Sequence, residues 1–175
     1  MTLSRPVRKL VLTAHITLAV GWLGAVAGFL ALALAGLTSQ DAQTVRSAYL
    51  AMDLTARFVI VPLSFAPLIT GPILSLGTPW GLFRHYWILA KLLITILSTV
   101  IMQVHLRPIS LLAVAAAQAS VLNPELHGLQ VQMVIASAAA LVALLAATTL
   151  GVYKPRGLTA FGWRKQQEQR ALYRQ

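Results

Sequence analysis

Four long apolar stretches, separated by short polar segments, dominate the chain. They cover approximately residues 10–37, 49–76, 86–106 and 126–153. A helix needs about 20 mainly apolar residues to cross the hydrocarbon core of a bilayer, and each stretch meets this length. The pattern predicts an all-α fold: a polytopic membrane four-helix bundle that forms one transmembrane domain, residues 1–175, and ends in a basic tail, residues 154–175. The first stretch is too long for a secretory signal and is expected to be retained.

Composition supports this prediction and excludes several other classes of protein. Of the 175 residues, 58% are hydrophobic and 10% are charged, which leaves too little polar surface for a soluble domain. The net charge of +10 comes mainly from basic residues that flank the apolar stretches, where they match anionic lipid headgroups and not nucleic acid. Because there is no cysteine, disulfides, iron–sulfur clusters, thiolate metal sites and covalently attached haem are excluded.

The distribution of basic residues predicts the orientation in the membrane. The N-terminal segment carries three basic residues, the middle loop carries Arg84 and the tail carries six, whereas the other two loops hold only Arg46 and Arg107 between them. Cytoplasmic segments carry an excess of Lys and Arg, so both termini are predicted to be cytoplasmic (N-in/C-in). On the outer side, residues 109–122 are apolar but too short to span, which favours a short interfacial helix. Asn123 and Pro124 are typical of the N-cap and first residue of a helix, here the fourth.

Polar residues within the apolar stretches fall on particular helical faces. At about 100° per residue, three helices each carry a polar stripe. The third helix has Trp87, Lys91, Thr95, Ser98, Met102 and His105 on one face; the second has Asp53, Arg57, Ser64, Gly71 and Ser75; the fourth has Gln130, Ser137, Thr148 and Gly151. Because polar residues are costly in lipid, these stripes are predicted to face the interior of the bundle.

The first helix presents two different faces. His15 and Trp22, seven residues apart, share one face that we interpret as part of a site. Roughly opposite lies a seam of small residues that contains Gly24 and Gly28 in a Gly-x-x-x-Gly pattern. Such seams let helix backbones approach closely, so Gly24 and Gly28 are candidate structural residues for docking a second copy or a membrane partner.

His15 and Lys91 are the candidate functional pair. Each lies about five residues inside the cytoplasmic end of its helix, roughly 7–8 Å deep, so both are predicted to face one cavity. Two interpretations of Lys91 stay open: a catalytic residue on the polar stripe, or a side chain that extends to the interface. His15 is likewise either a site residue or a hydrogen-bonded structural residue.

Two further pairs of polar residues are candidates for other roles. Asp53 and Arg57 are four residues apart on a helix, which favours a structural ion pair over a gate or a proton path. His105 and His127 both fall near the outer surface and form a candidate metal site, although no close spacing of histidines supports it.

The chain resembles known membrane proteins at several of these residues. The chain is similar to HemJ-type protoporphyrinogen oxidases at His15, Trp22 and Gly24, at Tyr49-x-x-Met52-Asp53 and at Trp87-x-x-x-Lys91. It also resembles CopD-type copper-resistance proteins and small bacterial four-helix membrane proteins that carry Gly-Trp-Leu-Gly and Gly-Thr-Pro-Trp-Gly-Leu-Phe-Arg-His runs. The resemblance implies a b-type haem protein of the bacterial cytoplasmic membrane, with His15 as an axial ligand to the iron, Lys91 functionally important, and Trp22 and Trp87 beside the cofactor.

Three functions remain open at this point. The first is a haem-binding redox protein, which the resemblance implies to be an oxidoreductase; no flavin or nicotinamide fingerprint is present. The second is transport of copper or another small solute along the polar stripes. The third is a non-catalytic partner subunit that docks through the glycine seam. A partner subunit is expected to be colourless, whereas a haem protein is coloured.

Overall fold

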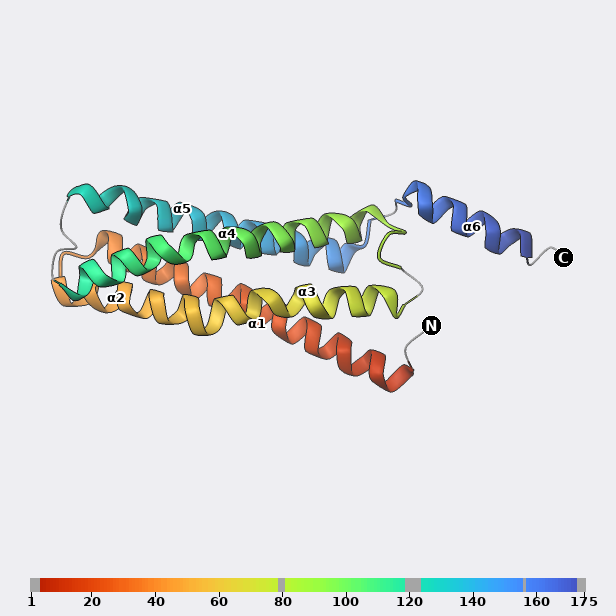
Figure 1. Ribbon diagram of the computed structural model, residues 1–175, viewed down its shortest axis with the longest axis horizontal. Coiled ribbons are helices and arrows are strands. Elements are labelled where there is room, and N and C mark those ends of the chain that lie inside the picture. Colours follow the sequence, from red (N-terminus) through yellow and green to blue (C-terminus); the bar gives the residue numbers. More distant parts are fainter. Residues whose placement is uncertain (1–3, 79–80, 119–123, 156, 173–175) are drawn as a thin grey trace.

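The computed structural model describes residues 4–78, 81–118, 124–155 and 157–172, and the elements in these ranges are helices (Figure 1). In chain order they are α1 (Arg5–Thr38), α2 (Ala42–Thr55), the single π-helical turn η1 (Ala56–Ile60), α3 (Val61–Leu76), α4 (Tyr86–Ala117), α5 (Pro124–Tyr153) and α6 (Ala160–Leu172). Because α2, η1 and α3 follow one another without a break, they form one long helical segment.

Four helical segments are long and apolar enough to cross a membrane. They are Arg5–Thr38, Ala42–Leu76, Tyr86–Ala117 and Leu126–Tyr153. The predicted all-α fold with four long apolar helices is thereby confirmed. Successive segments run in opposite directions, so both termini lie at the same end of the molecule (Figure 1).

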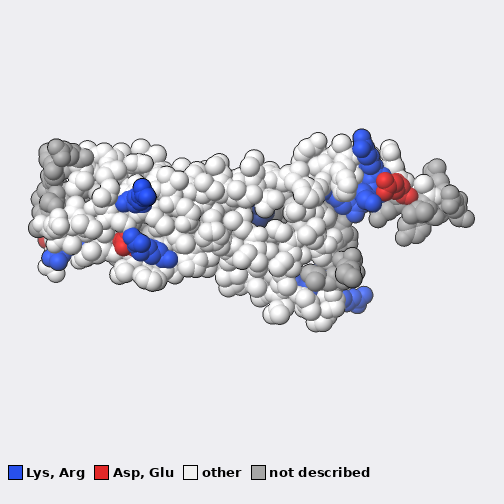
Figure 2. Space-filling view, in the orientation of Figure 1, with Lys and Arg blue, Asp and Glu red and all other residues white. Residues whose placement is uncertain are grey.

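The four segments stand at the corners of a square when the bundle is viewed along its axis. Helix α1 packs against α2, α3 and α5, and α4 packs against the same three helices, which puts α1 and α4 at opposite corners. Large apolar side chains such as Phe58 (72% exposed) and Val142 (67% exposed) cover the outside of the bundle. Charged side chains are sparse over the middle of the visible face and gather toward its two ends (Figure 2). This surface is the one expected where lipid is the solvent.

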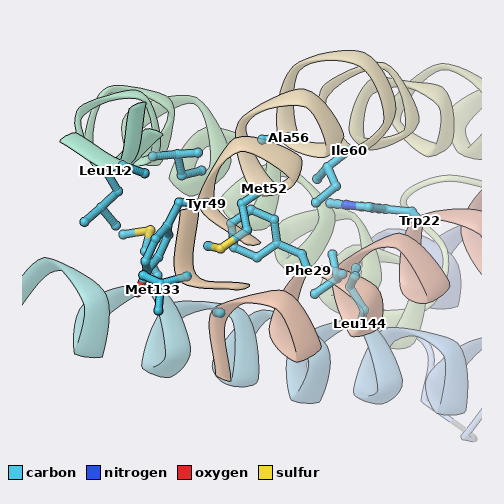
Figure 3. Close-up of a cluster of buried hydrophobic side chains, with 14 residues drawn as sticks. Trp22, Phe29, Tyr49, Met52, Ala56, Ile60, Leu112, Met133 and Leu144 are labelled. Atoms are coloured by element: carbon cyan, nitrogen blue, oxygen red, sulfur yellow. The ribbon is translucent and has the colours of Figure 1, made fainter. Parts of the chain in front are cut away.

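The core lies in the half of the bundle away from the termini. Tyr49 and Met52 of α2, Leu112 of α4 and Met133 of α5 are fully buried there (Figure 3). At Gly36 of α1 the backbone comes so close to the Tyr49 ring that a Cβ would lie 2.7 Å from Cζ. Any larger residue at position 36 would have to displace the Tyr49 ring or α1, so glycine is favoured where α1 and α2 meet.

The predicted end of the third span at residue 106 is wrong, because α4 continues to Ala117. Ile109, Leu112 and Ala116 are buried and keep the helical period across Pro108, so residues 109–117 pack inside the bundle and do not form a separate interfacial helix. Residues 119–122 of that prediction lie outside the described residues. Helix α5 begins at Pro124 as predicted, and Asn123 is outside the described residues.

The segment before α6 is attached to the loop that precedes α4. Thr159 donates its backbone N–H to Arg84 O at 3.0 Å and its hydroxyl to Phe83 O. Tyr86 N donates to Gly157 O at 3.3 Å. These bonds hold the start of the basic tail at the same end of the bundle as the first residues of α1.

Candidate functional site

A cavity of about 410 Å³ lies between the ends of α1, α3, α4 and α5 on the side of the termini. His15 from α1 and Lys91 from α4 both line it. The two helices start at the same end of the bundle, and His15 lies ten residues after the first residue of α1 while Lys91 lies five residues after the first residue of α4. The prediction that His15 and Lys91 face one cavity is confirmed.

This cavity, called the basic cavity below, has a strongly positive wall. Arg8, Lys9, Lys91 and Lys154 line it, and the described lining residues include no Asp or Glu. Most of the remaining wall is apolar, as at Leu12 and other Leu, Ile and Pro side chains. The combination favours a ligand that has an apolar body and anionic groups.

His15 is held in one orientation by α3. Its Nδ1 lies 2.7 Å from Thr70 Oγ1, and the Thr70 hydroxyl donates to Ala66 O at 2.8 Å. A hydroxyl has one hydrogen, so its oxygen accepts from His15 Nδ1–H. In the neutral ring the other nitrogen, Nε2, carries a lone pair, and the described residues offer it no hydrogen-bond partner. A buried imidazole whose Nδ1–H is held in this way is typical of a metal ligand.

Lys91 faces the basic cavity and packs toward α5. In the described part of the chain, its Nζ has neither a hydrogen bond nor an ion pair. A Cβ on Gly151 would lie 3.1 Å from Nζ, so the glycine leaves room for the head of the lysine. The position on a cavity wall supports the interpretation of Lys91 as a site residue over that of a side chain at the interface.

The two candidate tryptophans lie in different places. Trp87 lines the basic cavity, and its ring centroid is 6.3 Å from that of His85. Trp22 is buried in the core, 3% exposed, and lines a second cavity nearer the middle of the bundle. Trp22 shares a helical face with His15 but lies two turns deeper, which separates it from the basic cavity.

The second cavity, called the apolar cavity below, has a volume of about 450 Å³. It lies between α1, η1, α4 and α5 and shares no lining residue with the basic cavity. The predicted polar stripe of α4 is divided between the two: Trp87, Lys91 and Thr95 line the basic cavity, and Ser98, Met102 and His105 line the apolar one.

The two histidines of the predicted outer metal site lie on different surfaces. His105 lines the apolar cavity, and its Nδ1 is 2.8 Å from Ile101 O. His127 is exposed on α5 and is not part of that wall. Within the described ranges, no group of three or more His, Asp or Glu side chains is placed to hold a metal ion. A site made by these two histidines stays a prediction.

The predicted ion pair of Asp53 and Arg57 is present. Arg57 Nε lies 3.0 Å from both carboxylate oxygens of Asp53, and Arg57 Nη2 donates to Ser110 Oγ. The Ser110 hydroxyl lies 3.1 Å from Asp53 Oδ1 and 2.8 Å from Leu106 O of its own helix, and these two acceptors share its one hydrogen. The network joins the second helical segment to α4 at the turn η1 and has the form of a structural cross-link.

Gly24 and Gly28 lie on the outside of the bundle. Both are exposed, and a Cβ on either would meet no atom within 4 Å. The seam is therefore not used for packing against the described helices of the same chain.

Comparison with family models, curated proteins and solved structures finds no match to this chain. Function has to be inferred from the two cavities and the residues on their walls.

Proposed function

We propose that the protein is a b-type haem-binding redox protein of the bacterial cytoplasmic membrane, with haem in the basic cavity. One observation carries the proposal. Two nitrogen atoms that have no partner among the described residues belong to side chains that line one cavity. They are Nε2 of the His15 imidazole, which carries a lone pair, and Nζ of the Lys91 ammonium group. The first is a haem ligand by its chemistry, and the second suits a haem carboxylate.

The residues of the basic cavity fit the chemistry of haem. His15 Nε2 would bind the iron, and the Thr70 hydroxyl keeps the imidazole in the required tautomer. The ammonium group of Lys91 and the basic residues Arg8 and Lys9 near the start of α1 would pair with the carboxylates. Apolar side chains and Trp87 would cover the macrocycle. The volume of about 410 Å³ falls within the usual range of ligand sites.

Haem supplies one-electron chemistry when it is bound. The chain contributes orientation and charge: His15 holds the iron, and Lys91 holds an anionic group at a fixed depth. If the substrate is a porphyrin carboxylate, as in the HemJ-type oxidases, Lys91 is the catalytic residue that contacts it. The basic ends of the chain, which lie together in the fold, support an orientation with both termini in the cytoplasm.

An absorption spectrum tests the proposal. The protein is purified in mild detergent from haem-sufficient cells, and spectra are recorded in the oxidised and dithionite-reduced states. We expect stoichiometric haem with split α and β bands after reduction. His15→Ala should lose the Soret band, whereas the control His105→Ala, an imidazole in the other cavity, should keep it.

Two results would overturn the haem proposal. One is a folded wild-type protein that stays colourless after hemin is added. The other is a His15→Ala spectrum identical to that of the wild type. Two variants, Lys91→Arg and Lys91→Leu, separate charge from packing. Loss of haem affinity in Lys91→Leu but not in Lys91→Arg supports pairing with a carboxylate. Wild-type affinity in both variants removes that role.

A second candidate function, a subunit that docks a second copy or a membrane partner, is favoured by the open faces of Gly24 and Gly28. If another helix packs closely on this seam, Gly28→Leu should dissociate the assembly. Molar mass measured by light scattering in detergent tests this. A wild-type monomer with no copurified chain contradicts it.

A further inference from the structure

The apolar cavity lies at mid-depth in the bundle. Trp22, on its wall, is at the centre of α1, and the cavity extends along α4 from Ile94 to Ile109. No Lys, Arg, Asp or Glu is among the described residues that line it. A fatty acid or a phospholipid headgroup would find no counter-charge here, so the cavity suits a neutral ligand that dissolves in the membrane.

Trp22 places a buried hydrogen-bond donor beside the cavity. Its indole Nε1 is buried and has no hydrogen-bond partner among the described residues. Buried tryptophan N–H groups usually have a partner, because an unpaired buried donor is unfavourable. A ligand with an oxygen acceptor would supply it.

His105 gives the same cavity an acceptor. A carbonyl oxygen only accepts hydrogen bonds, so the 2.8 Å contact with Ile101 O requires His105 Nδ1 to carry the hydrogen. In the neutral ring, Nε2 then holds a lone pair on the side away from the helix backbone. Ser137, also on the wall, donates its one hydroxyl hydrogen to Met133 O at 2.7 Å. It therefore has no hydrogen to donate to His105 Nε2, which is left for a ligand.

We propose that the apolar cavity binds a lipid-soluble hydroquinone. A hydroquinone has an apolar ring and hydroxyl groups that both donate and accept, so it satisfies Trp22 Nε1–H and His105 Nε2. The oxidised quinone has carbonyls that only accept, which leaves the His105 lone pair unpaired. The cavity therefore prefers the reduced form. This site is separate from the basic cavity and does not depend on haem.

Binding of three probes with related apolar tails tests the proposal. Protein in detergent is incubated under nitrogen with decylubiquinol, decylubiquinone or decylbenzene. The bound probe is extracted after affinity purification and corrected for uptake by empty micelles. We expect binding in the order quinol, quinone, decylbenzene. Two outcomes overturn the proposal without any variant. Either decylubiquinol binds no more strongly than decylbenzene, or decylubiquinone binds more strongly than decylubiquinol.

Variants locate the bound probe. Ala140→Leu fills the cavity and should abolish decylubiquinol binding, whereas Ala31→Leu, on the exposed face of α1, should not. Trp22→Phe should weaken binding about two- to tenfold, the usual effect of one neutral hydrogen bond. His105→Phe should remove the preference for the quinol. His15→Ala should leave probe binding unchanged even if it loses haem. Full binding by a folded Ala140→Leu variant would overturn the location.

Discussion

The contact between Gly36 and Tyr49 allows a sharp test of the packing between α1 and α2. A Cβ at position 36 would lie 2.7 Å from Tyr49 Cζ and 2.9 Å from Cε2, whereas ordinary contacts are 3.4–4 Å. Tyr49 is 1% exposed and packs in the core with Met52 and Met133, so its ring has no free space to enter. Gly36→Ala should force the ring or α1 to shift and lower stability.

Gly28 provides a matched control for the size of this effect. It lies on the same helix, and a Cβ there meets no atom of the described residues within 4 Å; the comparison uses monomeric protein, in which the seam of Gly24 and Gly28 is not engaged. Both substitutions gain the same intrinsic helix propensity, so the difference between them isolates the clash. Overpacking costs about 1–3 kcal/mol, and each kcal/mol shifts melting by about 2–4 °C in a chain of this length, so Gly36→Ala should melt roughly 2–12 °C below Gly28→Ala.

Gel filtration after heating in detergent gives the melting midpoints. The double variant Gly36→Ala with Tyr49→Leu should lose less stability than the sum of the two single variants, because the smaller side chain makes room for the methyl group. Equal midpoints for Gly36→Ala and Gly28→Ala would refute the close approach of α1 to Tyr49.

Charged groups lead to two further predictions. Arg57→Ala should lower the free energy of unfolding by about 1–3 kcal/mol, because it leaves Asp53 with Ser110 alone, and replacing both charges (Asp53→Asn with Arg57→Gln) should cost less. A double-mutant cycle of melting midpoints checks this. The Thr44 side chain and backbone donate to Asp41 and lower its pKa from 3.8. Since the folded pKa is the lower one, the stabilisation is full above about pH 4 and is lost as the pH falls through the folded pKa. The melting difference between wild type and Asp41→Ala should shrink in that range; a constant difference contradicts it.

The membrane fold could be predicted from the sequence because lipid imposes a simple rule on length and hydropathy. The end of α4 could not. Arg107 and Pro108 interrupt the apolar run and are typical of a helix end, yet Ile109, Leu112 and Ala116 continue the helical period into the core. Their burial outweighs the loss of one backbone hydrogen bond at the proline. This balance depends on packing partners such as Tyr49, which lie far away in the sequence.

The site could be predicted only where depth and helical face were enough. His15 and Lys91 lie on helices that start at the same end, and counting from the predicted starts at residues 10 and 86 placed both near that end; α1 begins five residues earlier, at Arg5, yet both side chains line one cavity. Trp22 shares the face of His15 but lies about 10 Å deeper at 1.5 Å per residue, and it lines the other cavity. Thr70 and Gly151 were not identified as neighbours of the pair, because they come from α3 and α5. Their register against α1 and α4 is set by loops and by the π-helical turn.

Thr70 offers a test of how the fold prepares His15. Removal of its hydroxyl in Thr70→Val leaves His15 Nδ1 without its partner and frees the ring to rotate. Loss of such a supporting hydrogen bond lowers metal affinity by about 10- to 100-fold, so hemin titration should show this loss and Thr70→Ser should restore affinity. Thr95→Val is the control, because Thr95 lines the same cavity but donates its hydroxyl to Lys91 O of its own helix at 2.8 Å. Equal hemin affinity in Thr70→Val and Thr95→Val would mean that Thr70 does not orient the ligand, and that the contact with His15 serves only to join α1 to α3.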